Sequence, residues 1–224
     1  MKKQVILYAL LCVIGLKVTG QTKTDLSLKV SSAAAANRAQ LAGYVWTRTV
    51  QVFIEGTLKN TVTSSLSIGP DGKIVVSAVS SISPDPPPTK GIRGKIAKGK
   101  IDDLKDYVEE AVKLSVGYLY MSKGKMVDYF DAANITQSGN TITVQGKSVN
   151  KPNDNATINL IAGTLAFISQ SFQSTLANGD AVDGTFNYKT FSNGLTAFDS
   201  GELDLPAKKM KLRISNTNYA KKLQ

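Results

Sequence analysis

Two pairs of neighbouring acids are the residues of this sequence most able to do catalytic chemistry: Asp102 with Asp103, and Glu109 with Glu110. Glycoside hydrolysis needs two carboxylates that face each other across the scissile bond. Adjacent residues of a helix point in different directions, so we expect these acids to be solvated helix charges and not catalytic residues. Because the chain has 17 acidic residues, a hydrolase built on another carboxylate pair stays open as an alternative.

The chain offers few other nucleophiles or metal ligands. It contains no histidine, and Cys12 is its only cysteine. A Ser-His-Asp triad, a Cys-His pair and the usual zinc sites all require one of these side chains. The stretch NGDAVDG at 178–184 is similar to part of a calcium loop, but it lacks the series of oxygen ligands that ends in a bidentate acid. We expect a turn there, with no metal and no cofactor.

The amino terminus has the composition of a cleavable secretory signal. The basic start MKKQ precedes an apolar run at 5–16 and a short polar segment at 17–21. The apolar run is shorter than the about 20 residues that span a bilayer. Val18 and Gly20 have small side chains of the kind that signal peptidase needs near the cleavage site. We therefore predict that residues 1–20 are a signal peptide.

Removal of that signal would leave 21–224 as a single domain. Cleavage takes away Cys12, so the mature domain could form no disulfide and would depend on its core for stability. Loss of the three lysines in the signal lowers the formal net charge from +10 to +7. We expect a monomer in the periplasm, with an extracellular or outer-membrane-associated location as alternatives.

Hydrophobic periodicity predicts a helix followed by a sheet. The alanine-rich stretch at 24–42 can be capped by Thr24 or Asp25, and Gly43 stands just past its end. From residue 44 apolar and polar residues alternate with a period of two, which is typical of strands. Three long strands of a twisted, curled antiparallel sheet are predicted at 44–55, 57–68 and 73–82.

Residues 84–100 interrupt the strand pattern. Three consecutive prolines at 86–88 cannot donate hydrogen bonds to a β ladder, and basic residues follow them among glycines. We expect an exposed basic connection, which either contacts an anionic surface such as lipid headgroups or is simply solvated. Its basic residues are Lys90, Arg93, Lys95, Lys98 and Lys100.

The period becomes helical from 101 to about 134, with a break expected at Gly117 or at 122–124. We therefore predict an α+β fold in which a long curled antiparallel sheet, half-barrel-like, carries an N-terminal helix and a central helical hairpin on its concave face. Further strands are predicted at 141–144, 156–161, 164–176, 184–191, 195–205 and 210–214.

This order of elements resembles the half-barrel fold of the periplasmic lipoprotein carriers of the LolA and LolB type. The resemblance rests on YVWTRTVQVFIEGTLKN (44–60), SIGPDGK (67–73), FNYKTFSNGL (186–195) and MKLRISNTNY (210–219). Together with the basic run KGIRGKIAKGK (90–100), these stretches are also similar to an uncharacterised family of exported bacterial proteins. The carriers use an arginine inside the barrel, and the resemblance suggests Arg48 as its counterpart.

The first function that fits such a fold is an exported, soluble binding protein for an apolar or lipidic ligand, with a lipid or lipoprotein as its partner. A curled sheet covered loosely by helices encloses a cavity, whereas tight packing buries the same residues in a plain core. The sequence leaves both arrangements open. The candidate ligand contacts are Trp46, Arg48, Val50, Val52, Leu66, Leu104, Val108, Tyr118, Leu119 and Phe130.

The second function is an interaction module that docks on an anionic membrane surface or an acidic partner without a ligand cavity. Its contact would be made by the basic segment 90–100 and by basic residues near the C-terminus, and salt would weaken it. Nucleic-acid binding is disfavoured by export and by the lack of aromatic residues in the basic runs. The C-terminal basic residues are Lys208, Lys209, Lys211, Arg213, Lys221 and Lys222.

Overall fold

The computed structural model describes residues 22–84 and 91–222, and the side chains of 22–84 and 103–222. The predicted signal peptide, residues 1–20, lies outside the described residues. Within these ranges the chain forms three α-helices, one short 3-10 helix (Pro206–Lys208) and ten strands. None of the described helices is long and apolar enough to cross a membrane.

Helix α1, Lys23–Leu41, lies close to its predicted position. Its N-cap is Thr22, whose side chain accepts a hydrogen bond from the Asp25 amide at 3.1 Å. The sequence had predicted Thr24 or Asp25 as the cap, and this prediction was wrong. The buried residues of α1 all lie in its first half, and its centre is a run of four alanines. The second half of the helix therefore presents few large side chains to the sheet.

The ten strands form one antiparallel sheet in the order β3-β2-β1-β10-β9-β8-β7-β6-β5-β4. The sheet does not close on itself, and β3 and β4 are its two edges. The sequence predicted the successive hairpins, but not the pairing of β1 with β10 that joins the two ends of the chain. The strands are β1 (Tyr44–Ile54), β2 (Thr57–Ile68), β3 (Ile74–Ile82), β4 (Asn134–Ser138), β5 (Thr141–Lys147), β6 (Asn155–Ile161), β7 (Phe167–Thr175), β8 (Ala181–Thr190), β9 (Thr196–Leu205) and β10 (Met210–Lys221).

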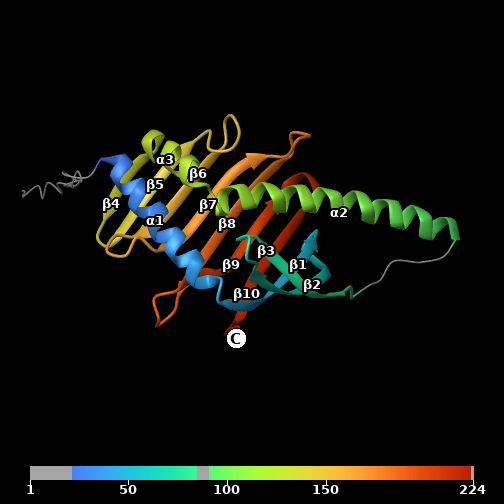
Figure 1. The fold of residues 1–224 in the computed structure, drawn as a ribbon. Coiled ribbons are helices and arrows are strands. Elements are labelled where there is room, and N and C mark those ends of the chain that lie inside the picture. Colours follow the sequence, from blue (N-terminus) through green and yellow to red (C-terminus); the bar gives the residue numbers. More distant parts are fainter. Residues whose placement is uncertain (1–21, 85–90, 223–224) are drawn as a thin grey trace, which may run out of the picture.

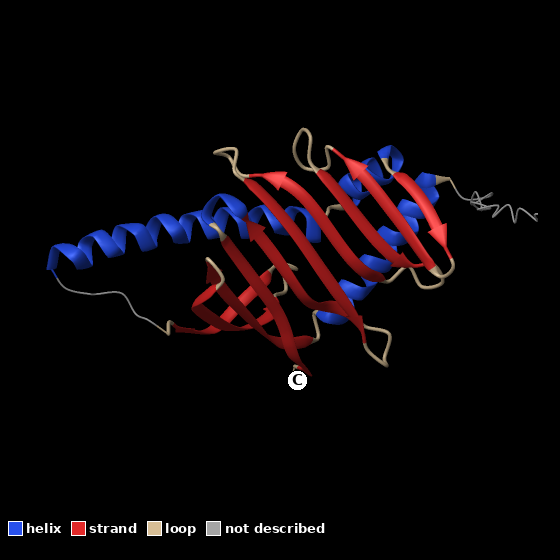
Figure 2. Ribbon diagram, turned by 180° about the vertical axis from the view of Figure 1, so that it is seen from behind, coloured by secondary structure: helices blue, strands red, loops and turns tan. Residues whose placement is uncertain are grey.

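The three helices lie on one face of the sheet (Figure 1), and the view from behind shows the strands of the opposite face with no described helix over them (Figure 2). At the other end from β4, the strands β1–β3 curl toward the helical side. These observations confirm the predicted α+β fold, with a long curled antiparallel sheet and helices on its concave face.

Helix α2, Gly91–Leu119, begins ten residues earlier than the predicted start at 101. The expected irregular basic connection at 84–100 therefore differs from the structure over 91–100, which is helical. Glycine in a helix costs only about 1 kcal/mol relative to alanine, against about 3 kcal/mol for proline. A helix that forms in the strongly amphipathic segment after residue 100 can extend back through such glycines, since each added residue gains a hydrogen bond. The glycines were thus a weaker stop signal than the prolines at 86–88.

The helical hairpin is broken after Leu119, and α3, Lys123–Ala132, follows Ser122 as its N-cap. This break lies beside the segment 122–124 that the sequence indicated. The short strand β4 was not predicted. It pairs only with β5 at the sheet edge, and a single half-buried residue, Ile135, gives it too little apolar alternation to be recognised.

The main hydrophobic core lies between the helices and strands β5–β10. Two glycines let aromatic rings pack directly on the sheet. A Cβ atom at Gly146 would lie 2.3 Å from the ring of Tyr129, and one at Gly184 would lie 2.2 Å from the ring of Phe172. The ring of Tyr118 stacks on Phe172 in turn, with centroids 4.1 Å apart. The end of α2 is thereby anchored over β7 and β8.

A second, smaller hydrophobic cluster lies under the curled end of the sheet. Trp46, Leu66 and Ile68 form it, with half-buried apolar residues of α1, β3 and β10 packed around them. The two clusters are separate, although both are on the helical side of one continuous sheet. The space between them is the feature that the functional argument depends on.

Candidate functional site

A pocket of about 420 Å³ lies between helix α1 and the curled end of the sheet. Its walls come from the second half of α1, the end of α2 with the start of α3, the β6–β7 turn, and strands β1–β3 and β8–β10. Residues of both hydrophobic clusters line it, including Met126 and Phe198 on one side and Trp46 and Ile68 on the other. Small-molecule sites usually measure about 300–1,000 Å³, so this pocket can hold a ligand.

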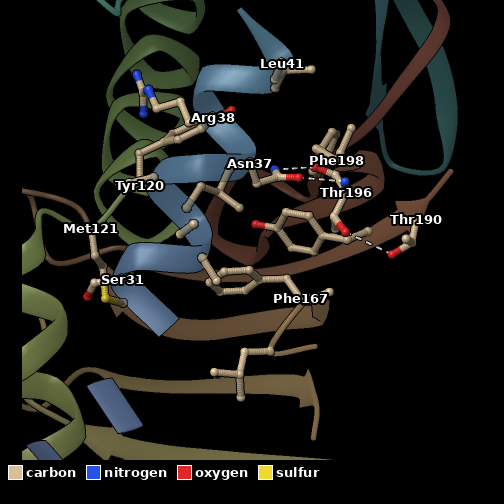
Figure 3. Close-up of a pocket in the computed structure, with 18 of the residues that line it drawn as sticks. Ser31, Asn37, Arg38, Leu41, Tyr120, Met121, Phe167, Thr190, Thr196 and Phe198 are labelled. Carbon is tan, nitrogen blue, oxygen red and sulfur yellow. Dashed lines mark hydrogen bonds between the residues drawn. The ribbon is translucent and has the colours of Figure 1, made fainter. Parts of the chain in front are cut away.

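The space exists because α1 is held above the sheet by a polar clamp in place of apolar packing. The side-chain amide of Asn37 donates to the carbonyl of Thr196 at 2.6 Å, and its oxygen accepts from the Thr196 amide at 2.7 Å (Figure 3). Beside the clamp, Ala33 and Ala34 line the pocket with minimal side chains. A helix with large apolar residues at these positions would fill the gap.

Aromatic side chains make up much of the remaining wall. Phe167 and Tyr188 have ring centroids 5.4 Å apart, and Trp46 stacks on Tyr219 at 5.8 Å. The Tyr219 hydroxyl donates to the Phe198 carbonyl at 2.6 Å, and the Tyr188 hydroxyl donates to Gln170. Burial raises the pKa of Tyr219 to about 12 and raises the pKa of Tyr188 as well. Both phenols therefore stay neutral near pH 7.

Two buried polar atoms of the lining residues have no hydrogen-bond partner. They are the Ser31 hydroxyl and the Trp46 indole N–H, on residues that are 8% and 3% exposed. Among the described residues, four buried side-chain atoms in total lack a hydrogen-bond partner, and these two are among them. Native proteins leave few buried polar groups unpaired. Both of these atoms belong to residues that line the pocket.

Among the described residues, the charged ones that line the pocket are Arg38 and Lys123, both exposed, and none of the lining residues is acidic. Arg38 donates from Nη2 to the Gly72 carbonyl at 2.5 Å. Its guanidinium group lies over the ring of Tyr120, 5.3 Å from the centroid. In Figure 3 the Arg38 and Tyr120 side chains lie side by side at the α1 side of the pocket. This rim of the pocket is therefore positively charged.

A buried carboxylate positions the wall that α2 contributes. Asp154, which is 2% exposed, accepts hydrogen bonds from the amides of Val149 at 2.5 Å and of Asn150 and Lys151 at 2.8 Å each. It also accepts a hydrogen bond from the Tyr118 hydroxyl, and burial together with this contact raises the pKa of Tyr118. The residues that directly follow Tyr118, 119–121, line the pocket. The Asp154 cluster therefore fixes their position.

With this geometry established, the chain can be compared with known proteins. No protein-family model matches it, and no curated protein matches it. A DUF1329 family protein from Desulfovibrio piger has a TM-score of 0.41 and 10% sequence identity, covering 91% of this chain and 95% of its own. A LolA superfamily protein from Nitrosomonas europaea has a TM-score of 0.35 and 8% identity, covering 88% and 94%.

Both proteins are structurally similar to this chain at low sequence identity. The resemblance to LolA-type proteins stated from the sequence is thus confirmed as a structural similarity at low sequence identity. At 8% and 10% identity the likeness concerns the fold alone. The site has to be judged on its own residues.

Two of the ten predicted ligand contacts, Trp46 and Leu119, line the pocket. Arg48 lies beside it, since its Nε donates at 3.0 Å to the side chain of Asn216, which is a lining residue. Val50 is half-buried on β1 outside the lining. The others pack in the hydrophobic clusters: Leu66 in the small one, and Val52, Leu104, Val108, Tyr118 and Phe130 in or against the main core.

Sequence reasoning placed the ligand under the central hairpin, whereas the pocket lies under α1. It missed Asn37 and Arg38 on that helix and the contributions of β9 and β10. One signal was present: the alanine run in α1 left that helix without an apolar stripe large enough to fill the space above a sheet. The β9 and β10 residues could not be found, because the β1–β10 pairing brings them to Trp46 from the far end of the sequence.

The basic residues proposed for an anionic surface divide into two groups. Lys90 lies outside the described residues, and the side chains of Arg93, Lys95, Lys98 and Lys100 are not among those described. Three of the C-terminal residues form surface ion pairs. These are Lys209 with Glu55 at 2.8 Å, Lys211 with Glu202 at 2.5 Å and Arg213 with Glu202 at 3.3 Å.

Of the acids singled out in the sequence, the side chain of Asp102 is not among those described, and the other three do not line the pocket. Asp103 and Glu109 are exposed on α2, and Glu110 accepts a hydrogen bond from the Ala177 amide at 2.6 Å. At 178–180 the chain makes a turn in which the Asn178 side chain accepts from the Asp180 amide at 3.0 Å. No group of three or more His, Cys, Asp or Glu residues in the described parts of the chain could hold a metal ion.

Proposed function

We propose that this domain is an exported binding protein for an apolar or lipidic ligand, and that the pocket under α1 is its binding site. The observation that carries the proposal is the unfilled space of about 420 Å³ between two separate hydrophobic clusters, walled mainly by aromatic and aliphatic side chains. Burying an apolar chain there would release about 0.8 kcal/mol per methylene.

The apolar surface continues outside the pocket and supports the same proposal. Val76 pairs with Leu66 and Val79 pairs with Ser64, and paired residues of neighbouring strands share a face. Val76 and Val79 are therefore on the pocket side of the sheet, where they are 55% and 63% exposed. An apolar strip thus leads from the small cluster to the β3 edge, and a ligand chain could lie along it.

The proposed role is binding without catalysis. In the part of the chain that the structure describes, no Asp, Glu, His or Cys lines the pocket, and these residues supply most general bases and nucleophiles. If residues 1–20 are cleaved as we expect, the domain works in the periplasm, and a lipid or a lipoprotein is the partner that this pocket suits. We propose that it acts as a monomer.

The proposal predicts that binding strengthens with chain length. Octanol, decanol and dodecanol should displace the neutral fluorescent probe N-phenyl-1-naphthylamine with affinities that rise about fourfold per methylene, until the pocket is filled. The titration uses the chain from residue 21 without detergent. A protein that binds neither the probe nor dodecanol, or that binds the three alcohols equally, would show that the pocket is not an apolar binding site.

Ionic strength separates this function from surface docking. Alcohol binding in the pocket should be nearly insensitive to salt, because no charge is neutralised. Docking on anionic vesicles through basic segments should weaken steeply between low and high salt. Sedimentation with vesicles that contain an anionic lipid therefore measures the alternative independently of the pocket.

A further inference from the structure

We propose that the ligand is a single-chain amphiphile with an anionic head group, and that Arg38 and Lys123 hold this head group at the rim of the pocket. The inference rests on the proposed function, since it assigns the chemical class of the ligand for that site. Its starting point is the charge of the lining. Arg38 and Lys123 are cationic, the half-buried phenols Tyr188 and Tyr219 are neutral, and none of the described lining residues carries a carboxylate.

Arg38 has the donors that an anion needs. A guanidinium group carries five N–H donors, and among the described residues the Gly72 carbonyl is the one acceptor that Arg38 contacts. The contact with the Tyr120 ring holds the guanidinium group at the rim of the pocket. Arginine in this state suits a carboxylate or phosphate, which can accept two parallel hydrogen bonds.

The acid next in sequence to Gly72 is already paired with a lysine. Asp71, which precedes Gly72, pairs with Lys73 at 3.3 Å and also accepts a hydrogen bond from the Lys73 amide at 3.0 Å. This amide contact, followed by the Lys73 side chain, lowers the pKa of Asp71. No salt bridge joins Arg38 to an acid within the described ranges, so the neutralising charge at the rim would come from the ligand.

The second cation, Lys123, begins α3 three residues after Tyr120 and lines the pocket as well. From Arg38 back to Ser31, α1 covers about 10 Å of the pocket at 1.5 Å per residue. That stretch lines the space with alanines, and the apolar side chains of Met121 and Phe167 line the same pocket. A head group at the rim would therefore have one apolar chain beneath α1.

The test compares three ligands that share one chain: dodecanol, dodecanoate and dodecyl phosphate, at a pH where both acids are ionised. In probe displacement, the wild type should bind at least one anion about tenfold more tightly than the alcohol, and high salt should reduce this preference. The tighter of the two anions identifies the head group as a carboxylate or a phosphate.

The variants Arg38→Gln and Lys123→Gln test the assigned residues. Arg38→Gln should reduce the preference to about threefold or less, and Lys123→Gln should cause a smaller loss; the preference is the ratio of anion to dodecanol affinity in the same variant. Lys113→Gln, which removes an exposed cation of α2 outside the pocket, is the matched control and should keep the full preference. An unchanged preference in both rim variants would overturn the assignment.

The outcomes distinguish the two proposals. If dodecanol binds but neither anion binds more tightly, the anionic head group is refuted and the apolar pocket stands. If none of the three ligands binds to folded wild-type protein, the proposed function fails together with the inference. Because the preference is a ratio within one variant, a general change of the pocket alters both affinities and is separated from loss of the head-group contact.

Discussion

Replacing Ala34 with phenylalanine is expected to weaken dodecanol binding more than tenfold. Ala34 lines the pocket from α1, and a phenyl ring at this position would occupy the space beneath the helix. Excluding even two methylenes of the ligand chain from the pocket costs about 1.6 kcal/mol, which is more than a factor of ten in affinity. Displacement of N-phenyl-1-naphthylamine measures the effect.

Ala36→Phe is the matched control for this experiment. Ala36 is exposed and is not among the lining residues. It points away from Ala34, because residues two positions apart in a helix are rotated by about 200° around its axis. The two substitutions have the same intrinsic cost for the helix, so Ala36→Phe should bind dodecanol like the wild type. If Ala34→Phe binds dodecanol as tightly as the wild type does, the binding site lies elsewhere. If both variants lose affinity equally, the substitutions disturb helix α1 itself and the loss does not come from filling the pocket.

Replacing Asp154 with alanine is expected to lower the free energy of unfolding by about 3–5 kcal/mol. The change leaves the buried Tyr118 hydroxyl and three backbone amides without their common acceptor. It also frees the end of α2, whose next residues line the pocket, so dodecanol affinity should fall too. Urea denaturation measures the stability, and the slope of the transition checks that unfolding stays cooperative.

Asp128→Ala provides the comparison for Asp154→Ala. Asp128 is an exposed acid of α3, and its removal should change stability by less than about 0.5 kcal/mol. A loss of under about 1 kcal/mol in Asp154→Ala would mean that the loop at 148–154 finds other partners, and that this carboxylate does not fix the α2 wall.

Local patterns in the sequence predicted most of the fold. Alternation gave the strands 44–55 and 57–68 nearly to the residue, because each has one face on the helical side of the sheet. The pairing of β1 with β10 lay beyond such reasoning, since register between distant strands depends on tertiary packing. The start of α2 at Gly91 was missed because glycines interrupt a helix less strongly than prolines do.

The site was less predictable than the fold. The apolar residues of the central hairpin, such as Leu104 and Phe130, looked suited to a ligand but pack against or within the main core. Apolar periodicity shows which face of a helix or strand is buried. It does not show which helix leaves a space between itself and the sheet. In this protein the gap arises from alanines and from the Asn37 clamp, and neither produces an apolar pattern.

Native mass spectrometry of protein exported and purified without detergent would show whether the pocket holds a ligand. We expect wild type and Ala36→Phe to carry an added mass matching one single-chain amphiphile on residues 21–224, and Ala34→Phe to lose most of this species. The contrary result would be wild-type protein at its bare mass that also takes up no added dodecanol or dodecanoate. That outcome would leave the space under α1 without a ligand to bind.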